Sequence, residues 1–225
     1  MKLVIITNFI VSIFSLTYAS SSNKISLRDV EWIEHTNKKR IQVYVPKNFK
    51  HPSGLVPVRF KAILDYPLSK VLTVLADNTR KKEWVPKLTS SKVIEEVSES
   101  DVIVYYRYST PWPFSDRDFL INSSVHYNAQ TKTLNVLMKS IDDHKDLKDG
   151  DCCVRGYSHD GYTILKFIDK NKTEIEMAFL NEFGGFIPNF VINLVQKKWP
   201  YKFMGNLRLQ LKKSNIITNP KFKIN

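Results

Sequence analysis

Few side chains of this chain could do acid–base, nucleophilic or metal chemistry. Its 225 residues include five histidines and two cysteines. The histidines lie far apart, at His35, His51, His126, His144 and His159. Metal sites need ligands at short, fixed spacings, and the histidines form no such cluster in the sequence. We therefore expect neither a metal site nor a cofactor.

General acid–base catalysis is the remaining chemistry for histidine. Only His126 and His159 fall on expected strands or strand turns, and neither has an evident carboxylate partner in the sequence. A catalytic histidine needs a neighbouring group that orients it or exchanges a proton with it. We therefore expect that the protein is not an enzyme.

The two cysteines are adjacent in the chain, at Cys152 and Cys153. In a strand, adjacent side chains point to opposite faces, so these two are poorly placed to bridge each other. There is no third cysteine to offer another pairing. The sequence predicts a fold that does not depend on disulfide bonds.

Residues 1–19 have the pattern of a secretory signal peptide. Lys2 supplies a positive start, residues 3–16 are mostly apolar, and Thr17-Tyr18-Ala19 places small residues at the minus-three and minus-one positions. The apolar run is shorter than the roughly 20 residues that a bilayer span needs. We expect cleavage after Ala19 and export to the periplasm, the medium or a secretory compartment.

The chain carries a formal net charge of +12, of which only Lys2 would be lost on cleavage. For an exported basic domain an anionic membrane surface is a commoner partner than nucleic acid, and solubility alone is the other explanation of the charge. The length after cleavage suits a single domain at 20–213 with a loose tail at 214–225. We expect a monomer that binds no nucleic acid.

The elements that must position any site are mostly strands. Alternating or continuous apolar patterns predict strands at nine places, namely 40–45, 56–64, 92–97, 102–108, 119–127, 134–140, 152–158, 162–169 and 174–180. A tight turn is expected at His159-Asp160-Gly161. Residues 29–34 could form one helical turn with Val30 and Ile33 facing inward.

Two helices are expected as well. Pro67 suits a first helical turn, and Leu68, Val71, Leu72 and Leu75 follow at helical spacing up to about residue 77. A long amphipathic helix should begin at Pro188 and run to about residue 213, with a kink at Pro200. This order of elements predicts an α+β fold in which a curved antiparallel sheet surrounds one long helix. One helix cannot fill so large a sheet, so the remaining volume holds either more side chains or a ligand.

Two short motifs frame the second half of the chain. The first is Pro111-Trp112-Pro113-Phe114 followed by Arg117-Asp118-Phe119, a rigid aromatic loop that enters a strand. The second is Gly184-Gly185-Phe186-Ile187-Pro188, a glycine pair before the last helix. With Trp84 after a basic turn, they make the chain resemble the StAR-related lipid-transfer (START) domain over roughly residues 32–213. The resemblance implies a helix-grip fold whose internal cavity shelters one lipid.

Within that family the chain looks most similar to the phosphatidylcholine-transfer branch, which has a proline-rich aromatic loop before Arg-Asp. The resemblance places Tyr106, Phe119 and Tyr157 in an aromatic cage, and Lys81 or Arg80 at a phosphate. Aromatic faces attract a cation by roughly 0.5–2 kcal/mol each. Core packing is the alternative role for the three rings, and solvated surface charge is the alternative for the two basic residues.

The same resemblance implies a role for the two loops in membrane contact. Trp112, Phe114, Phe183 and Phe186 would insert at the interface, and Gly184 and Gly185 would act as a hinge that opens the mouth. Local packing is the alternative role for these aromatic residues. The expected function is to bind one lipid, with phospholipid first, and to exchange it at membranes.

Three other functions stay open. The first is a carrier of sterols or fatty acids, of which a sterol is disfavoured because Ser123 stands where the sterol branch has a basic residue. A helix-grip enzyme, such as a cyclase or hydrolase, would need a catalytic pair that points into the cup. A protein-interaction module would have its cup filled by side chains.

Overall fold

The computed structural model describes residues 26–145, 147, 152–213 and 215–218. The expected signal peptide and part of the expected tail lie outside these residues. The elements follow in the order β1 (Trp32–Lys38), β2 (Ile41–Pro46), β3 (Val58–Leu64), α1 (Leu68–Ala76), η1 (Lys81–Glu83), β4 (Leu88–Glu96), β5 (Asp101–Tyr108), β6 (Arg117–Asn128), β7 (Thr133–Ser140), β8 (Val154–Arg155), β9 (Tyr157–Asp169), β10 (Lys172–Glu182) and α2 (Asn189–Lys212).

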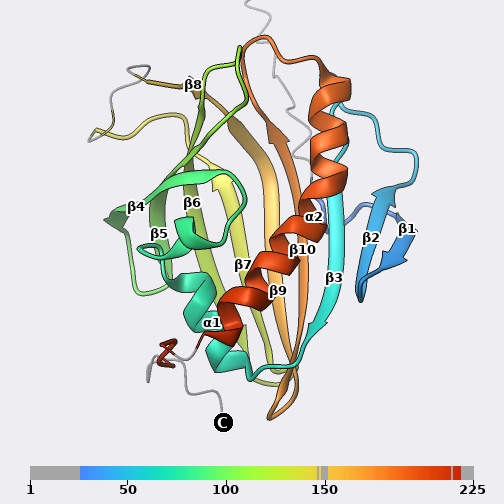
Figure 1. Cartoon of the computed structure of the whole chain (residues 1–225), viewed down its shortest axis with the longest axis vertical. Coiled ribbons are helices and arrows are strands. Elements are labelled where there is room, and N and C mark those ends of the chain that lie inside the picture. The colour runs from blue at the N-terminus through green and yellow to red at the C-terminus, as the bar shows by residue number, and fades with distance from the viewer. Residues whose placement is uncertain (1–25, 146, 148–151, 214, 219–225) are drawn as a thin grey trace, which may run out of the picture.

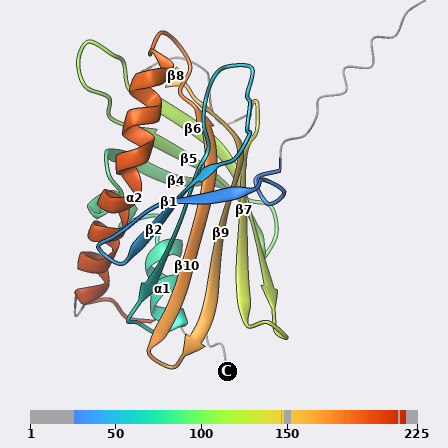
Figure 2. The ribbon, with the colours of Figure 1, turned by 90° about the vertical axis from the view of Figure 1, so that its right-hand side faces the viewer.

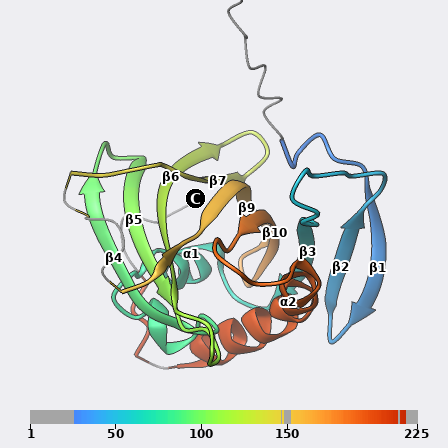
Figure 3. The same cartoon turned by 90° about the horizontal axis from the view of Figure 1, so that it is seen from above.

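The strands form one sheet in the order β1-β2-β3-β10-β9-β7-β6-β5-β4, and short β8 pairs in parallel with the start of β6. The pairs along the main path are antiparallel. Seen from above, the sheet curls around α1 and α2, and α2 lies across the open side of the curl (Figure 3). We call the face toward the helices the inner face and the opposite face the outer face. This is the α+β helix-grip architecture that the sequence predicts.

The main core lies between the inner face and the two helices. In β3 the residues Val58, Phe60, Ala62 and Leu64 are buried, and the residues between them are less so. Phe60 packs edge-on against Phe203 of α2, at 6.1 Å between ring centroids. Alternate residues of a strand share one face, so this pattern fixes the inner face of β3. Figure 2 shows both helices on the same side of the long strands β9 and β10.

A smaller cluster covers part of the outer face. Tyr162 and Ala178 are cross-strand neighbours on β9 and β10, and they pack with Leu27 and Leu55 from the segments before β1 and β3. The backbone N–H of Leu27 donates to the carboxylate of Asp160 at 2.7 Å. The N-terminal segment is thereby held against the outside of the cup.

The helices agree with the sequence pattern. Helix α1 begins after Pro67 and ends at Ala76, and it buries Leu68, Val71, Leu72 and Val74. Helix α2 contains Pro200 and changes direction part-way along its length (Figure 1). No helix among the described residues is long and apolar enough to span a membrane.

Two local expectations are wrong. Residues 29–34 form no helical turn, because a turn and bend at 27–30 lead into strand β1 at Trp32, whose residues pair with β2. There is no tight turn at 159–161: β9 runs unbroken from Tyr157 to Asp169 because its whole length pairs with β10. The expected turn is instead a β-bulge in β9. Leu180 pairs with Asp160 and Asn181 pairs with Ser158, so His159 is the extra residue of the bulge.

The expectation that the two cysteines are poorly placed to bridge each other is also wrong. Cys152 and Cys153 lie in a bend before β8, and their sulfur atoms are bonded to each other. The expected strand would have separated the two side chains, but the bend brings them together.

Candidate functional site

Lys81 and Tyr106 form a polar contact inside the cup. Lys81 Nζ donates to Tyr106 Oη at 3.0 Å and to Asn78 Oδ1 at 2.8 Å. The ammonium also lies 5.1 Å from the centre of the Tyr106 ring. Burial lowers the pKa of Lys81 to about 8, because the charged form loses solvation. The hydrogen-bond partners of this cation are neutral groups, so it can still bind an anion.

A row of aromatic rings continues from this contact along the inner face. Tyr106 contacts Tyr108 at 6.4 Å between centroids, Tyr108 contacts Phe119 at 5.9 Å, and Phe119 contacts Phe183 at 5.8 Å. Burial raises the pKa of both Tyr106 and Tyr108, and both residues are partly buried and pack against the main core. The row therefore lines part of the inner face of β5 and β6.

Phe119 owes its position to Gly156, which the sequence does not mark as important. A Cβ atom built on Gly156 would lie 2.4 Å from Phe119 Cζ. No side chain larger than hydrogen fits there while the ring keeps its place. The glycine is thus required by close approach and not by a turn.

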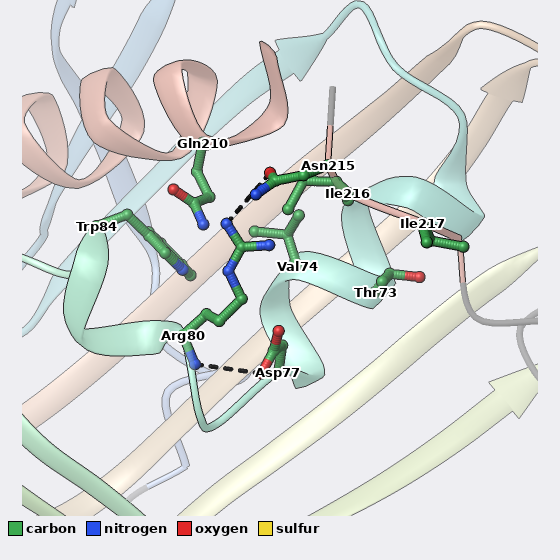
Figure 4. Close-up of a pocket in the computed structure, with 9 residues that line it drawn as sticks. All are labelled: Thr73, Val74, Asp77, Arg80, Trp84, Gln210, Asn215, Ile216 and Ile217. Carbon is green, nitrogen blue, oxygen red and sulfur yellow. Dashed lines mark hydrogen bonds between the residues drawn. The ribbon is translucent and has the colours of Figure 1, made fainter. Parts of the chain in front are cut away.

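Arg80 and Lys81, although adjacent, point to different places. Arg80 forms an ion pair with Glu83 at 2.9 Å and donates to Asn215 Oδ1 at 3.4 Å. It lines a pocket of about 180 Å³ between the end of α1 and the end of α2, which Figure 4 shows with Trp84 and Gln210 on one side. Lys81 is therefore the basic residue that reaches Tyr106. Asn215 and Ile216, which belong to the expected loose tail, line the pocket that holds Arg80.

The structure does not bring Tyr157 to Tyr106 and Phe119. Tyr106 and Phe119 are cross-strand neighbours on the inner face, whereas Tyr157 is the neighbour of Glu182 on the outer face. The Tyr157 ring contacts His159 at 5.1 Å between centroids. Of the three expected cage residues, two lie together.

His159 has a carboxylate partner that the sequence does not reveal. Its Nε2 lies 2.9 Å from Glu182 Oε2, and its ring lies 4.8 Å from that of His51. This group lies on the outer face beside Tyr157 and not in the cup. Burial lowers the pKa of His51, and His159 lowers it further. No group of three or more histidine, cysteine or acidic residues in the described part of the chain could hold a metal ion.

The two aromatic loops meet at the end of the cup where α2 begins (Figure 1). Arg117, at the start of β6, donates from Nε to the carbonyl of Phe183 at 3.0 Å and from Nη2 to that of Gly184 at 3.2 Å. Trp112 is 92% exposed and Phe186 is 91% exposed, whereas Phe114 and Phe183 are partly buried. One charged side chain thus holds together two loops that lie 66 residues apart in sequence.

Arg117 and Asp118 do not pair with each other. Asp118 accepts from Arg155 of β8, with 2.9 Å between Oδ1 and Nε, while Arg117 binds the loop before α2. Gly184 and Gly185 have φ angles of +58° and +60°, a backbone region that favours glycine. A Cβ on Gly184 would also lie 2.4 Å from the carbonyl oxygen of Arg155. The glycine pair therefore lets this loop pack closely on β8.

Two side-chain amides on the cup side have buried atoms without a hydrogen-bond partner among the described residues. They are the Gln196 side chain, through both Nε2 and Oε1, and the Asn181 side chain, through Oδ1. Gln196 is only 2% exposed and lies three residues before Trp199, whose ring contacts Phe179 at 5.2 Å. Asn181 is the next residue after Phe179 on the inner face of β10. Nothing in the sequence marks these two residues.

Comparisons with known proteins agree with this geometry. The structure is similar to those of human STARD10 (TM-score 0.73, 18% identity, covering 81% of this chain and 74% of that one) and human StAR-related lipid transfer protein 5 (TM-score 0.72, 17% identity, 80% and 86%). It is also similar to a StAR-related lipid transfer protein of Xanthomonas axonopodis (TM-score 0.70, 23% identity, 81% and 99%). No curated protein matches the chain.

These structural likenesses show the fold. The model of the START domain family matches residues 15–213, which is most of the chain. The two aromatic loops, the glycine pair and α2 all lie within the matched residues. The chain belongs to the START domain family.

Proposed function

We propose that this protein carries one phospholipid in the space between the inner face and α2, and that it exchanges the lipid at membranes without catalysing a reaction. The observation that carries the proposal is the contact of Lys81 with Tyr106, a partly buried cation beside the row of aromatic rings, in a member of the START family. The family implies lipid binding or transfer. The kind of lipid is our inference from the side chains.

The head group would lie at Lys81, because an ammonium without a carboxylate hydrogen-bond partner attracts a phosphate. Tyr106 and Phe119 would contact the neighbouring part of the head group. The acyl chains would lie on the apolar inner face, where each buried CH₂ contributes about 0.8 kcal/mol. Two chains could therefore hold the lipid with few polar contacts.

Exchange would take place at the end of the cup where the two loops meet. Trp112 and Phe186 are almost fully exposed there, and Phe190 and Leu194 add apolar surface on the first turns of α2. Large exposed aromatic side chains at one end of a molecule suit insertion into a membrane interface. The net positive charge of the chain favours an anionic surface, at about 1 kcal/mol for each basic residue near it. We propose that the glycine pair flexes when α2 or its loop moves aside.

We further propose that the protein is exported and works as a monomer. The proposal of export rests on residues 1–19 alone, which have the composition of a signal peptide. N-terminal sequencing of the protein from its host would show a start at Ser20. A start at Met1 would remove the proposal of export and leave that of lipid carriage.

The test is to extract lipid from the purified protein and to follow transfer of labelled phospholipid between vesicles. We expect about one bound lipid per chain, and we expect that K81M lowers the affinity for phospholipid about tenfold. K82M is the matched control, since Lys82 is exposed and adjacent. A protein that contains no lipid and moves none would overturn the proposal. Equal affinities for K81M and K82M would remove Lys81 from the site.

A further inference from the structure

A second cavity lies outside the cup, between the β1–β2 hairpin and α2. It has a volume of about 480 Å³ and is lined by His35, Thr36, Lys38, Val43, Lys197 and Tyr201. We call it the hairpin groove. Its volume is within the range of roughly 300–1,000 Å³ that ligand pockets occupy. Figure 3 shows the β1–β2 hairpin at the opposite end of the curled sheet from β5 and β6, which carry the aromatic row.

The floor of the hairpin groove is apolar. Val43 is 2% exposed and belongs to the main core, and the Tyr201 ring packs against that core. Lys197 and Tyr201 are four residues apart on α2, so they lie on one face of the helix, one turn apart. Thr36 is the cross-strand neighbour of Val43 and completes the hairpin side. An apolar chain placed here would be covered by protein on two sides.

The rim of the hairpin groove is basic. Lys38 and Lys197 contribute two ammonium groups, His35 adds a third basic group, and no acidic residue lines the groove. Neither lysine has an ion pair or hydrogen bond with another residue in the described part of the chain. Of the nearest acidic residues, Glu34 accepts a hydrogen bond from Gln42 at 3.0 Å, and Asp65 pairs with Arg40 at 2.9 Å. The positive charge of the rim is therefore not neutralised by neighbouring side chains.

The Tyr201 hydroxyl is not part of the groove surface. Its Oη is buried and makes no hydrogen bond to the described residues. A ligand in the groove would therefore meet the Tyr201 ring and not its hydroxyl group. The groove thus combines an apolar floor with basic groups on both walls.

We propose that the hairpin groove binds the carboxylate and first methylene groups of a long-chain fatty acid. The carboxylate would lie between Lys38 and Lys197. The first methylene groups would lie on Val43 and the Tyr201 ring. This site is independent of the phospholipid site in the cup, because it uses none of the same residues.

The test is photolabelling of the full-length protein with a fatty acid that carries a diazirine near its carboxylate, followed by mass spectrometry of the peptides. We expect labels on peptides that contain residues 35–43 or 197–201, and we expect that an excess of unlabelled oleate abolishes them. The methyl ester of the same probe should label these peptides at least tenfold less, because it has no charge. Labels confined to peptides of β5 and β6 would overturn the proposal.

A direct binding measurement with matched variants completes the test. K38Q/K197Q should weaken oleate binding at the groove at least tenfold, whereas K39Q/K198Q removes the same charge from exposed neighbours and should leave it unchanged. Y201F should leave oleate binding unchanged, because the hydroxyl is buried away from the groove surface. If the two double variants bind oleate equally, net charge alone explains the binding and the groove is not the site.

Discussion

The guanidinium of Arg117 holds the main chain of Phe183, with Nε 3.0 Å from the carbonyl oxygen. The same side chain reaches Gly184, so the loop before α2 is fastened to the start of β6. This contact joins the two motifs by which the sequence resembles its family. It also explains why an arginine, with several donors in a fixed plane, stands at this position.

We predict that R117K loosens the loop before α2. Lysine keeps the charge but cannot donate to both carbonyls in the same geometry, so stability should fall by about 2 kcal/mol. Hydrogen exchange at residues 183–188 should rise more than at the far end of the sheet. R107K is the control. Arg107 pairs with Asp116 in a partly exposed position, so R107K should lower the free energy of unfolding by less than about 1 kcal/mol. Equal exchange in both variants would contradict this role of Arg117.

We predict that Lys81 makes stability rise with pH in the alkaline range. Its folded-state pKa, about 8, lies below the ordinary value of 10.5, so the unfolded chain binds more protons between these values. The cost of burying the charge is fully present below about pH 8 and disappears by about pH 10.5, and it amounts to at most about 3 kcal/mol. Urea unfolding from pH 7 to pH 10.5 should show this rise in the wild type and in K82M. In K81M the part due to Lys81 should be absent, and a rise of the same size there would assign it to other groups.

We predict that W112A and F186A each weaken binding to anionic vesicles about tenfold. Burying a large aromatic side chain in a membrane interface is worth roughly 1.5–3 kcal/mol. Both residues are almost fully exposed, so the folded protein should keep its stability. I217A is the control, because Ile217 is 85% exposed and lies by the pocket between the ends of α1 and α2. Equal vesicle binding by all three variants would argue against docking through these loops.

We predict that Q196L stabilises the protein when no lipid is bound. Gln196 is buried with no partner among the described residues, so leucine removes an unsatisfied amide and should add about 1 kcal/mol. Q210L should do the opposite, because Gln210 is equally buried but donates to Glu83 at 3.0 Å. Thermal unfolding of the two delipidated variants tests this contrast. A loss of stability in Q196L would show that the amide has a partner, such as bound water.

The local patterns of the sequence predicted much of the fold. The alternating residues of β3 and the helical spacing after Pro67 lead to a buried face because a strand repeats every two residues and a helix about every 3.6. The aromatic loop and the glycine pair identified the family. These signals can be read locally because each lies within a few residues of chain.

The arrangement of the site depended on contacts between distant residues. Only the folded structure separates Lys81, which reaches Tyr106, from Arg80, which pairs with Glu83. The bulge at His159, which is set by pairing with β10, leaves Tyr157 on the outer face beside Glu182. One extra residue reverses the faces of the side chains on one side of the bulge relative to those on the other. The sequence by itself determined most of the elements, their order and the family. The tertiary structure decided which side chains meet, because strand register and loop packing depend on residues far apart in the chain.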